Sequence, residues 1–242
     1  FGLPAMGTHY DHIASSIRTT IRSKYWDTSR KLFADTYKHN SFSQHVNSLA
    51  VLAGIVTGDE AKQVMHSLLT DHDLIQVTIY FRYYQNQALN KAGLGDELLD
   101  HLQVWKEQMA LGLTTWAERP EPSRSDCHAW GSSPNIEFYR IILGVDSDAP
   151  GFGKVCIAPN LGTLKKVSGI VPHPLGDIAV DYEVDKKGKL IATIDLPETI
   201  KGTFVWKGQN YPLVSGHQVL TLNQQTPAGQ RTYYVSSSTG ND

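Results

Sequence analysis

Residues 138–157, FYRIILGVDSDAPGFGKVCI, divide this 242-residue sequence into two parts that differ in the spacing of their apolar residues. Before the octapeptide DSDAPGFG (146–153), apolar residues recur at helical spacing. The Pro-Gly pair inside it ends that pattern, and short runs of alternating apolar and polar residues follow. The sequence therefore predicts an α then β chain with two domains, residues 1–148 and 149–242.

The predicted helical half contains six segments with helical periodicity or helix-end signals. Several are apolar on more than one face, as in LAVLAGIV, which indicates a helix with neighbours on both sides. Paired helices joined by alternating short and longer connections favour a helical toroid or solenoid over a four-helix bundle. The predicted helices are His9–Lys24, Ser43–Val56, Asp59–Leu69, Leu74–Ala92, Asp96–Ala110 and Pro134–Leu143.

The second half reads as about seven short strands, each bounded by turn residues. Asp185–Gly188 and Lys207–Asn210 have the composition of hairpin turns. Strands at this spacing predict a small antiparallel β-sandwich. The last stretch, QQTPAGQRTYYVSSSTGND, reads as a polar C-terminal tail.

Composition excludes several classes of function. With 22 Lys+Arg against 24 Asp+Glu and no basic run, nucleic acid is not an expected partner. No apolar run approaches the roughly 18 residues of a membrane span, and the first residues lack the signature of a signal peptide. The start at Phe1 rather than Met predicts that sequence upstream is missing.

Residue spacing also argues against several kinds of chemistry. The ten histidines form no HExxH or comparable ligand set, so neither a metal nor another cofactor is expected. Phosphate-binding loops and GxSxG elbows are missing from the sequence. Only Cys127 and Cys156 are present, and their spacing leaves open whether they pair.

The stretch 111–131, LGLTTWAERPEPSRSDCHAWG, carries the main candidate site. It places the carboxylate of Glu118 between Trp116 and a Pro-rich loop, and then brings in His128 and Trp130. Aromatic faces pack on the C–H patches of a pyranose, while a carboxylate can activate a water. The alternative is a helix connection with core tryptophans and a solvated Glu. Core packing is also the rival role for Trp116 and His128, and it is the preferred role for Trp130.

Other candidates lie on the predicted helices. Gln44 and His45 begin the second one, where Asn47 is expected to cap or to bond between helices. Tyr80 and Phe81 belong to an aromatic-rich helix, and they are either core residues or part of a pocket wall.

Four segments resemble the C-terminal half of the bacterial α-L-rhamnosidases of glycoside hydrolase family 78. They are YWDTSRKLFADTYKHNSFSQHVNSLAVLAGI, QVTIYFRYYQNQALNKAG, TTWAERPEPSRSDCHAWGSSPNIEFYRIILGV and PGFGKVCIAPNLGTLKKVSGIVPHPLGDIAVDYEVD. Together they cover nearly the whole chain in the family's order. Two departures are Ala117, inserted between the aromatic residue and the glutamate, and the Pro-Glu-Pro stretch that follows. Glu121 in that stretch competes with Glu118, which is favoured because it adjoins the tryptophan.

The resemblance implies half of an (α/α)6 barrel followed by a β-sandwich, in an inverting enzyme that removes terminal α-L-rhamnose. It implies that Glu118 is the general base and that Trp116, His128, Gln44, His45, Tyr80 and Phe81 bind substrate. The general acid of this family lies upstream, so the chain by itself is expected to be inactive. The implied partners are a rhamnose-containing carbohydrate and the missing half, or a second copy of the chain. Compartment, aglycone and linkage stay open. The alternatives are another (α/α)6 glycosidase of glucan or trehalose type and a non-catalytic carbohydrate-binding module.

Overall fold

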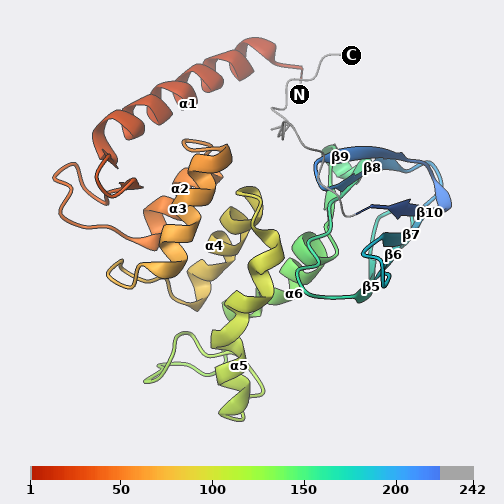
Figure 1. Ribbon diagram of the computed structural model, residues 1–242. Coiled ribbons are helices and arrows are strands. Elements are labelled where there is room, and N and C mark those ends of the chain that lie inside the picture. Colours follow the sequence, from red (N-terminus) through yellow and green to blue (C-terminus); the bar gives the residue numbers. More distant parts are fainter. Residues whose placement is uncertain (1, 224–242) are drawn as a thin grey trace. The chain divides into compact units, whose positions relative to one another are not determined.

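The computed structural model describes residues 2–223 and confirms the predicted order of helices followed by strands (Figure 1). The predicted polar tail lies outside the described residues. The chain forms two compact units, residues 1–134 and 135–242. No helix among the described residues is long and apolar enough to cross a membrane.

The division between the units lies at residue 134, whereas the sequence placed it after residue 148. The segment between these points belongs with the strands because its atoms bond to them and to the loops that join them. The Tyr182 hydroxyl donates to the Leu143 carbonyl at 2.9 Å. The Ile141 carbonyl accepts hydrogen bonds from the backbone N–H and the side chain of Asn160. Leu143 and Val145 are buried in the core of the β-rich unit.

Three helices form the centre of the helical unit: α2 (Gln44–Leu52), α3 (Gly58–Thr70) and α4 (Ile79–Lys91). Their inner faces bury one apolar cluster, which also includes both residues of β2 (Leu32–Phe33). That strand forms a small hairpin with β1 (Trp26–Asp27).

Helix α4 begins five residues later than predicted, because residues 74–78 form a bend, an isolated bridge and an irregular segment. Ile75 is the reason: its N–H donates to the Phe42 carbonyl, and its own carbonyl accepts from the N–H of Gln44. These two bonds form a parallel bridge between Ile75 and Ser43. The bridge keeps this segment out of the helix, although its apolar residues have helical spacing.

Helix α1 (Pro4–Tyr25) has no buried residue, although it carries an apolar stripe. Met6, Tyr10, Ile13 and Ile17 follow one another at helical spacing, and all are exposed. Its C-terminal half is fixed to the rest of the unit. Nε of Arg18 donates to the Ala53 carbonyl, and the Arg22 guanidinium forms two hydrogen bonds with Glu60 of α3.

The fifth predicted helix is divided into a 3-10 segment, η1 (Gly95–Leu102), and α5 (Gln103–Ala110). Together with the first residue of α4, they bury a second, smaller cluster made of Ile79, Leu102 and Trp105. The short segment η2 (Ala129–Ser132) follows the site loop.

The division between the units falls after the first residue of α6 (Pro134–Glu137). The β-rich unit therefore begins with the other residues of α6 and a turn of π-helix, η3 (Phe138–Ile142). Its strands form two four-stranded sheets, in the orders β10-β7-β6-β5 and β3-β4-β8-β9. The strands are β3 (Val145–Ser147), β4 (Lys154–Ile157), β5 (Lys166–Val171), β6 (Ile178–Val184), β7 (Leu190–Leu196), β8 (Lys201–Trp206), β9 (Gln209–Leu213) and β10 (Gly216–Leu222), and η4 (Pro150–Phe152) lies between the first two.

The two sheets share one apolar core, and period-two burial along β6 and β7 assigns one face of each strand to it. The expectation of purely antiparallel sheets is wrong for one pair, because β4 and β8 run parallel. Three strands of the other sheet separate them in sequence, which gives the chain the long connection that a parallel pair needs.

Candidate functional site

The site loop, residues 111–128, is held together by hydrogen bonds across its two arms. The N–H of Glu118 donates to the Ser125 carbonyl at 2.8 Å, and the N–H of His128 donates to the Trp116 carbonyl at 2.7 Å. These bonds bring Glu118 and His128 to the same end of the loop, although ten positions separate them in sequence.

Side chains of helix α5 fix the loop and the residues after it by hydrogen bonds. The Ala117 N–H donates to Oε1 of Gln108 at 2.9 Å, and the Ala117 side chain is buried. Trp105 of α5 donates its indole N–H to the Gly131 carbonyl at 2.6 Å. The inserted alanine is therefore a packed part of the loop, and Glu118 follows it directly.

Glu118 forms a two-pronged ion pair with Arg124. Nε of Arg124 donates to one carboxylate oxygen at 2.8 Å, and Nη2 donates to the other at 2.5 Å. The Glu118 side chain is 23% exposed and that of Arg124 is 76% exposed. The hydrogen bonds from Arg124, with smaller contributions from the positive charges nearby, hold the pKa of Glu118 below its ordinary value. Glu118 is therefore a carboxylate at neutral pH.

This carboxylate lines a hollow of about 310 Å³ on the helical unit. The lining combines an aromatic wall with charged and polar groups, as in sites that bind small molecules. Its residues are Thr78, Tyr80, Glu118, Arg119, Arg124, His128 and Trp130. Of the seven predicted site residues, the structure thus brings together Glu118, His128 and Tyr80.

The two tryptophans of the stretch 111–131 have the reverse of their predicted placements. Trp116 packs against the cluster around Trp105 and does not line the hollow. Trp130 is 61% exposed, so the expectation that it is a core residue is wrong. The difference arises at Gly131, where a Cβ atom would lie 2.4 Å from Cβ of Trp116. Trp116 therefore occupies the space beside the glycine, while Trp130 faces outward.

Tyr80 and Trp130 form the aromatic wall of the hollow. Their ring centroids are 4.5 Å apart with an interplanar angle of 36°, and Tyr80 is 41% exposed. His128 meets Trp130 edge to face at 5.3 Å. Two apolar ring faces beside a carboxylate fit the amphipathic surface of a pyranose.

Phe81 and His45 lie behind this wall and are not among the residues that line the hollow. Their rings are 4.4 Å apart, and Tyr84 connects Phe81 to Tyr80. Burial lowers the pKa of His45. These two residues support the wall, and a direct contact with sugar stays a prediction for both.

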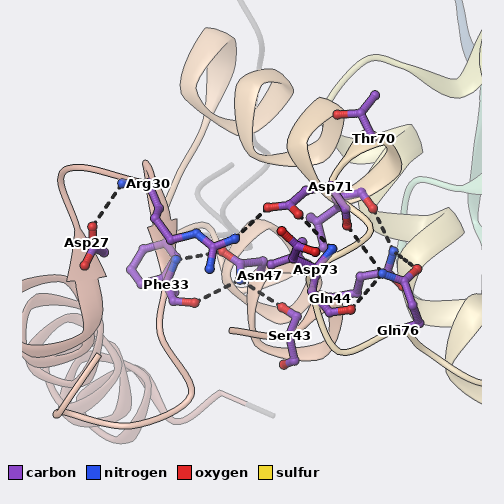
Figure 2. A network of polar contacts seen from close by, with 12 residues as sticks. Asp27, Arg30, Phe33, Ser43, Gln44, Asn47, Thr70, Asp71, Asp73 and Gln76 are labelled. Carbon is purple, nitrogen blue, oxygen red and sulfur yellow. Dashed lines mark hydrogen bonds and ion pairs between the residues drawn. The ribbon is translucent and has the colours of Figure 1, made fainter. Parts of the chain in front are cut away.

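Gln44 belongs to a polar network that joins α2, the end of α3 and the segment before α4 (Figure 2). Its amide nitrogen donates to the Leu68 carbonyl at 2.7 Å and to Oε1 of Gln76 at 2.9 Å. Its amide oxygen accepts from the N–H of Val77 at 2.9 Å. The residue is 5% exposed. Because both ends of its amide are used inside the protein, this geometry argues against the predicted sugar contact.

Asn47 has a structural role in the same network, but it bonds to the hairpin and not to a second helix as expected (Figure 2). Its side chain accepts from the N–H of Phe33 and donates to the carbonyls of Phe33 and Ser43. It thereby ties the β1–β2 hairpin to the first turn of α2.

Glu118 lines the hollow, whereas its competitor in the sequence does not. Glu121 is exposed, accepts a hydrogen bond from the N–H of Ser123 and does not line the hollow. Sequence reasoning missed Thr78, Arg119 and Arg124, which do. The turn-rich run PEPSRS was a signal that the chain returns on itself and brings an arginine back to Glu118.

Between residues 2 and 223 there is no group of three or more His, Cys, Asp or Glu side chains that could hold a metal ion. Both cysteines are free thiols, with Cys127 exposed and Cys156 partly buried.

Comparison with known proteins finds a family match in the β-rich unit and structural matches that extend over most of the chain. Residues 144–220 match the family described as the bacterial alpha-L-rhamnosidase C-terminal domain. No curated protein sequence matches the chain. Among solved structures, the chain is 27% identical to the family 78 rhamnosidase of Bacillus sp. GL1, with a TM-score of 0.69 over 78% of this chain and 22% of that one.

Two further structures share the fold. The α-L-rhamnosidase of Aspergillus terreus has 16% identity and a TM-score of 0.73, over 89% of this chain and 27% of that one. The α-L-rhamnosidase of Streptomyces avermitilis, complexed with L-rhamnose, has 15% identity and a TM-score of 0.72, over 91% of this chain and 25% of that one. The chain thus spans about a quarter of the length of the structures that it matches. Its predicted resemblance to the C-terminal part of the glycoside hydrolase family 78 α-L-rhamnosidases is confirmed.

Proposed function

We propose that this chain contributes the general base and part of the sugar pocket of an inverting α-L-rhamnosidase. The single observation that carries the proposal is the position of Glu118. It is a carboxylate held ionised by Arg124, and it lines a hollow walled by the rings of Tyr80 and Trp130. The similar protein from Streptomyces avermitilis is complexed with L-rhamnose, which supports rhamnose as the sugar.

In the proposed reaction, Glu118 takes a proton from a water as the water oxygen bonds to the anomeric carbon. The bond from that carbon to the glycosidic oxygen breaks, and a general acid protonates the leaving oxygen. An inverting pair of carboxyl groups is separated by about 6.5–9.5 Å to admit the water. Arg124 is mostly exposed and can release one oxygen of Glu118 for this water. The acid, by the family resemblance, lies outside this sequence.

The proposal includes the architecture that the resemblance implies. The helices form half of an (α/α)6 barrel, and the two sheets form its β-sandwich domain. The exposed apolar stripe of α1 supports an incomplete helical assembly, since such a stripe is normally covered. The remaining barrel helices or a second copy of the chain would cover it.

The deciding experiment replaces Glu118 by Gln in the complete polypeptide that carries this sequence. Removing a general base should lower kcat on an aryl α-L-rhamnoside about 10²–10⁴-fold and leave sugar binding intact. Glu121→Gln is the matched control, because that carboxylate is exposed and lies outside the hollow. Unchanged turnover in Glu118→Gln contradicts the proposal. A panel of aryl glycosides separates a rhamnosidase from a glucan- or trehalose-type enzyme.

The chain of residues 1–242 by itself is expected to show no turnover, because a base without its acid leaves the departing oxygen unprotonated. Turnover of an aryl α-L-rhamnoside by this chain would place the acid within it.

A non-catalytic carbohydrate-binding role is the second candidate. The observation in its favour is that Arg124 engages both oxygens of Glu118, as in an ion pair that only fixes a loop. The same Glu118→Gln variant distinguishes the two functions, since a binding module has no turnover to lose.

A further inference from the structure

The hollow carries more positive than negative charge. Its lining includes Arg119 and Arg124 but only one carboxylate, Glu118. The whole chain has a formal net charge of −2, so this surface differs in sign from the rest of the protein. Arg124 is neutralised by its ion pair with Glu118, which leaves the charge of Arg119 in excess.

Arg119 is available to a ligand. Its side chain is exposed, and within residues 2–223 it forms neither a hydrogen bond nor an ion pair. Its charge reaches the site, because it contributes to the lowered pKa of Glu118. A guanidinium presents several donors in a plane and binds carboxylates with two parallel hydrogen bonds.

The start of α4 adds to this positive potential. Thr78 precedes the helix and lines the hollow, but its side chain does not cap the first turn. The unpaired backbone N–H groups of a first turn favour a negative charge nearby. Both features therefore favour an anion at this side of the hollow.

The proposed reaction makes an uncompensated guanidinium costly. Glycoside hydrolysis passes through an oxocarbenium-like state with positive charge on the sugar. A second positive charge beside it raises the energy of that state unless an anion compensates it. A carboxylate on the substrate would provide that compensation and would also bind Arg119.

We propose that the hollow binds an acidic saccharide, in which a uronate is attached to the rhamnose, and that Arg119 binds the uronate carboxylate. This inference rests on the proposed function for the identity of the first sugar. The aromatic wall of Tyr80 and Trp130 receives the pyranose ring, and Arg119 distinguishes a uronate from the corresponding neutral hexose.

The test compares kcat/KM of the complete polypeptide that carries this sequence for two matched probes, measured by the L-rhamnose released. These are the methyl glycosides of α-L-rhamnosyl-(1→4)-glucuronate and of α-L-rhamnosyl-(1→4)-glucose, which differ only in the carboxylate. The kcat/KM for the acidic probe should be about tenfold higher at low salt, and the preference should shrink as salt screens the pair. Arg119→Gln should abolish the preference for the acidic probe.

Lys106→Gln is the matched control, because this exposed lysine of α5 is not among the lining residues and its loss changes the net charge equally. It should keep the preference. Equal kcat/KM for the two probes, no turnover of the acidic probe, or a preference that survives in Arg119→Gln would overturn the inference. The proposed function fails separately, through unchanged turnover in Glu118→Gln.

Discussion

Replacing Gln44 by Ala decides whether this residue holds the fold together or binds sugar. The substitution removes three buried hydrogen bonds, to the Leu68 carbonyl, the Gln76 side chain and the Val77 N–H. Leu68 lies in the last turn of α3, where a carbonyl has no partner within the helix. Each bond contributes about 1 kcal/mol net, so the loss should lower the free energy of unfolding by about 3 kcal/mol.

The assay is urea unfolding followed by far-UV circular dichroism, with L-rhamnose binding as the second readout. Gln63→Ala is the control, because this side chain of α3 is exposed and its loss should change stability by less than about 0.5 kcal/mol. If Gln44→Ala does not fold, Gln44→Glu gives a further test. It places a carboxylate against two oxygen acceptors, which raises the pKa of that carboxyl, so stability should recover as the pH falls.

The result that would refute the reasoning is a Gln44→Ala protein as stable as Gln63→Ala. If that stable protein had also lost rhamnose binding, the sugar contact expected from the sequence would be reinstated. Loss of stability with unchanged binding in the folded protein supports the structural role.

Three further predictions concern the site loop and the thiols. Gly131→Ala places a Cβ atom 2.4 Å from Cβ of Trp116 and should cost about 1–3 kcal/mol in thermal unfolding, with a shift in tryptophan fluorescence. In the complete polypeptide, the acidic limb of kcat/KM against pH should lie below the pH range in which an ordinary glutamate titrates, because hydrogen bonds from Arg124 lower the pKa of Glu118 and the base works only when ionised. Arg124→Gln removes the main cause of that lowering, so the limb should move upward. Burial and nearby aspartates raise the pKa of Cys156 to about 11, so at pH 8 iodoacetamide should label the exposed thiol much faster than Cys156.

Each of these predictions has an outcome that contradicts it. Unchanged unfolding of Gly131→Ala would mean that Trp116 yields without strain. An acidic limb that stays in place in Arg124→Gln would show that another group titrates there. Equal labelling of the two thiols would show that Cys156 is not protected by its surroundings.

The sequence by itself determined the class of the fold and the location of the site loop. Helical periodicity up to Leu143 and strand alternation after Lys154 are patterns of neighbouring residues. Such patterns predict the type and order of the elements without knowledge of their tertiary contacts. The site loop could be predicted for the same reason, since a glutamate, two tryptophans and a histidine lie within fifteen positions of the sequence.

Only the tertiary structure decided which side chains share the hollow. Sequence spacing gave no means of knowing that Trp116 fills the space beside Gly131 while Trp130 turns outward. It also could not show that Gln44 caps α3, a helix that begins fourteen positions later, or that Arg119 is left with an unmatched charge. Burial and hydrogen bonding depend on residues distant in sequence, so these roles became visible only once the chain was folded.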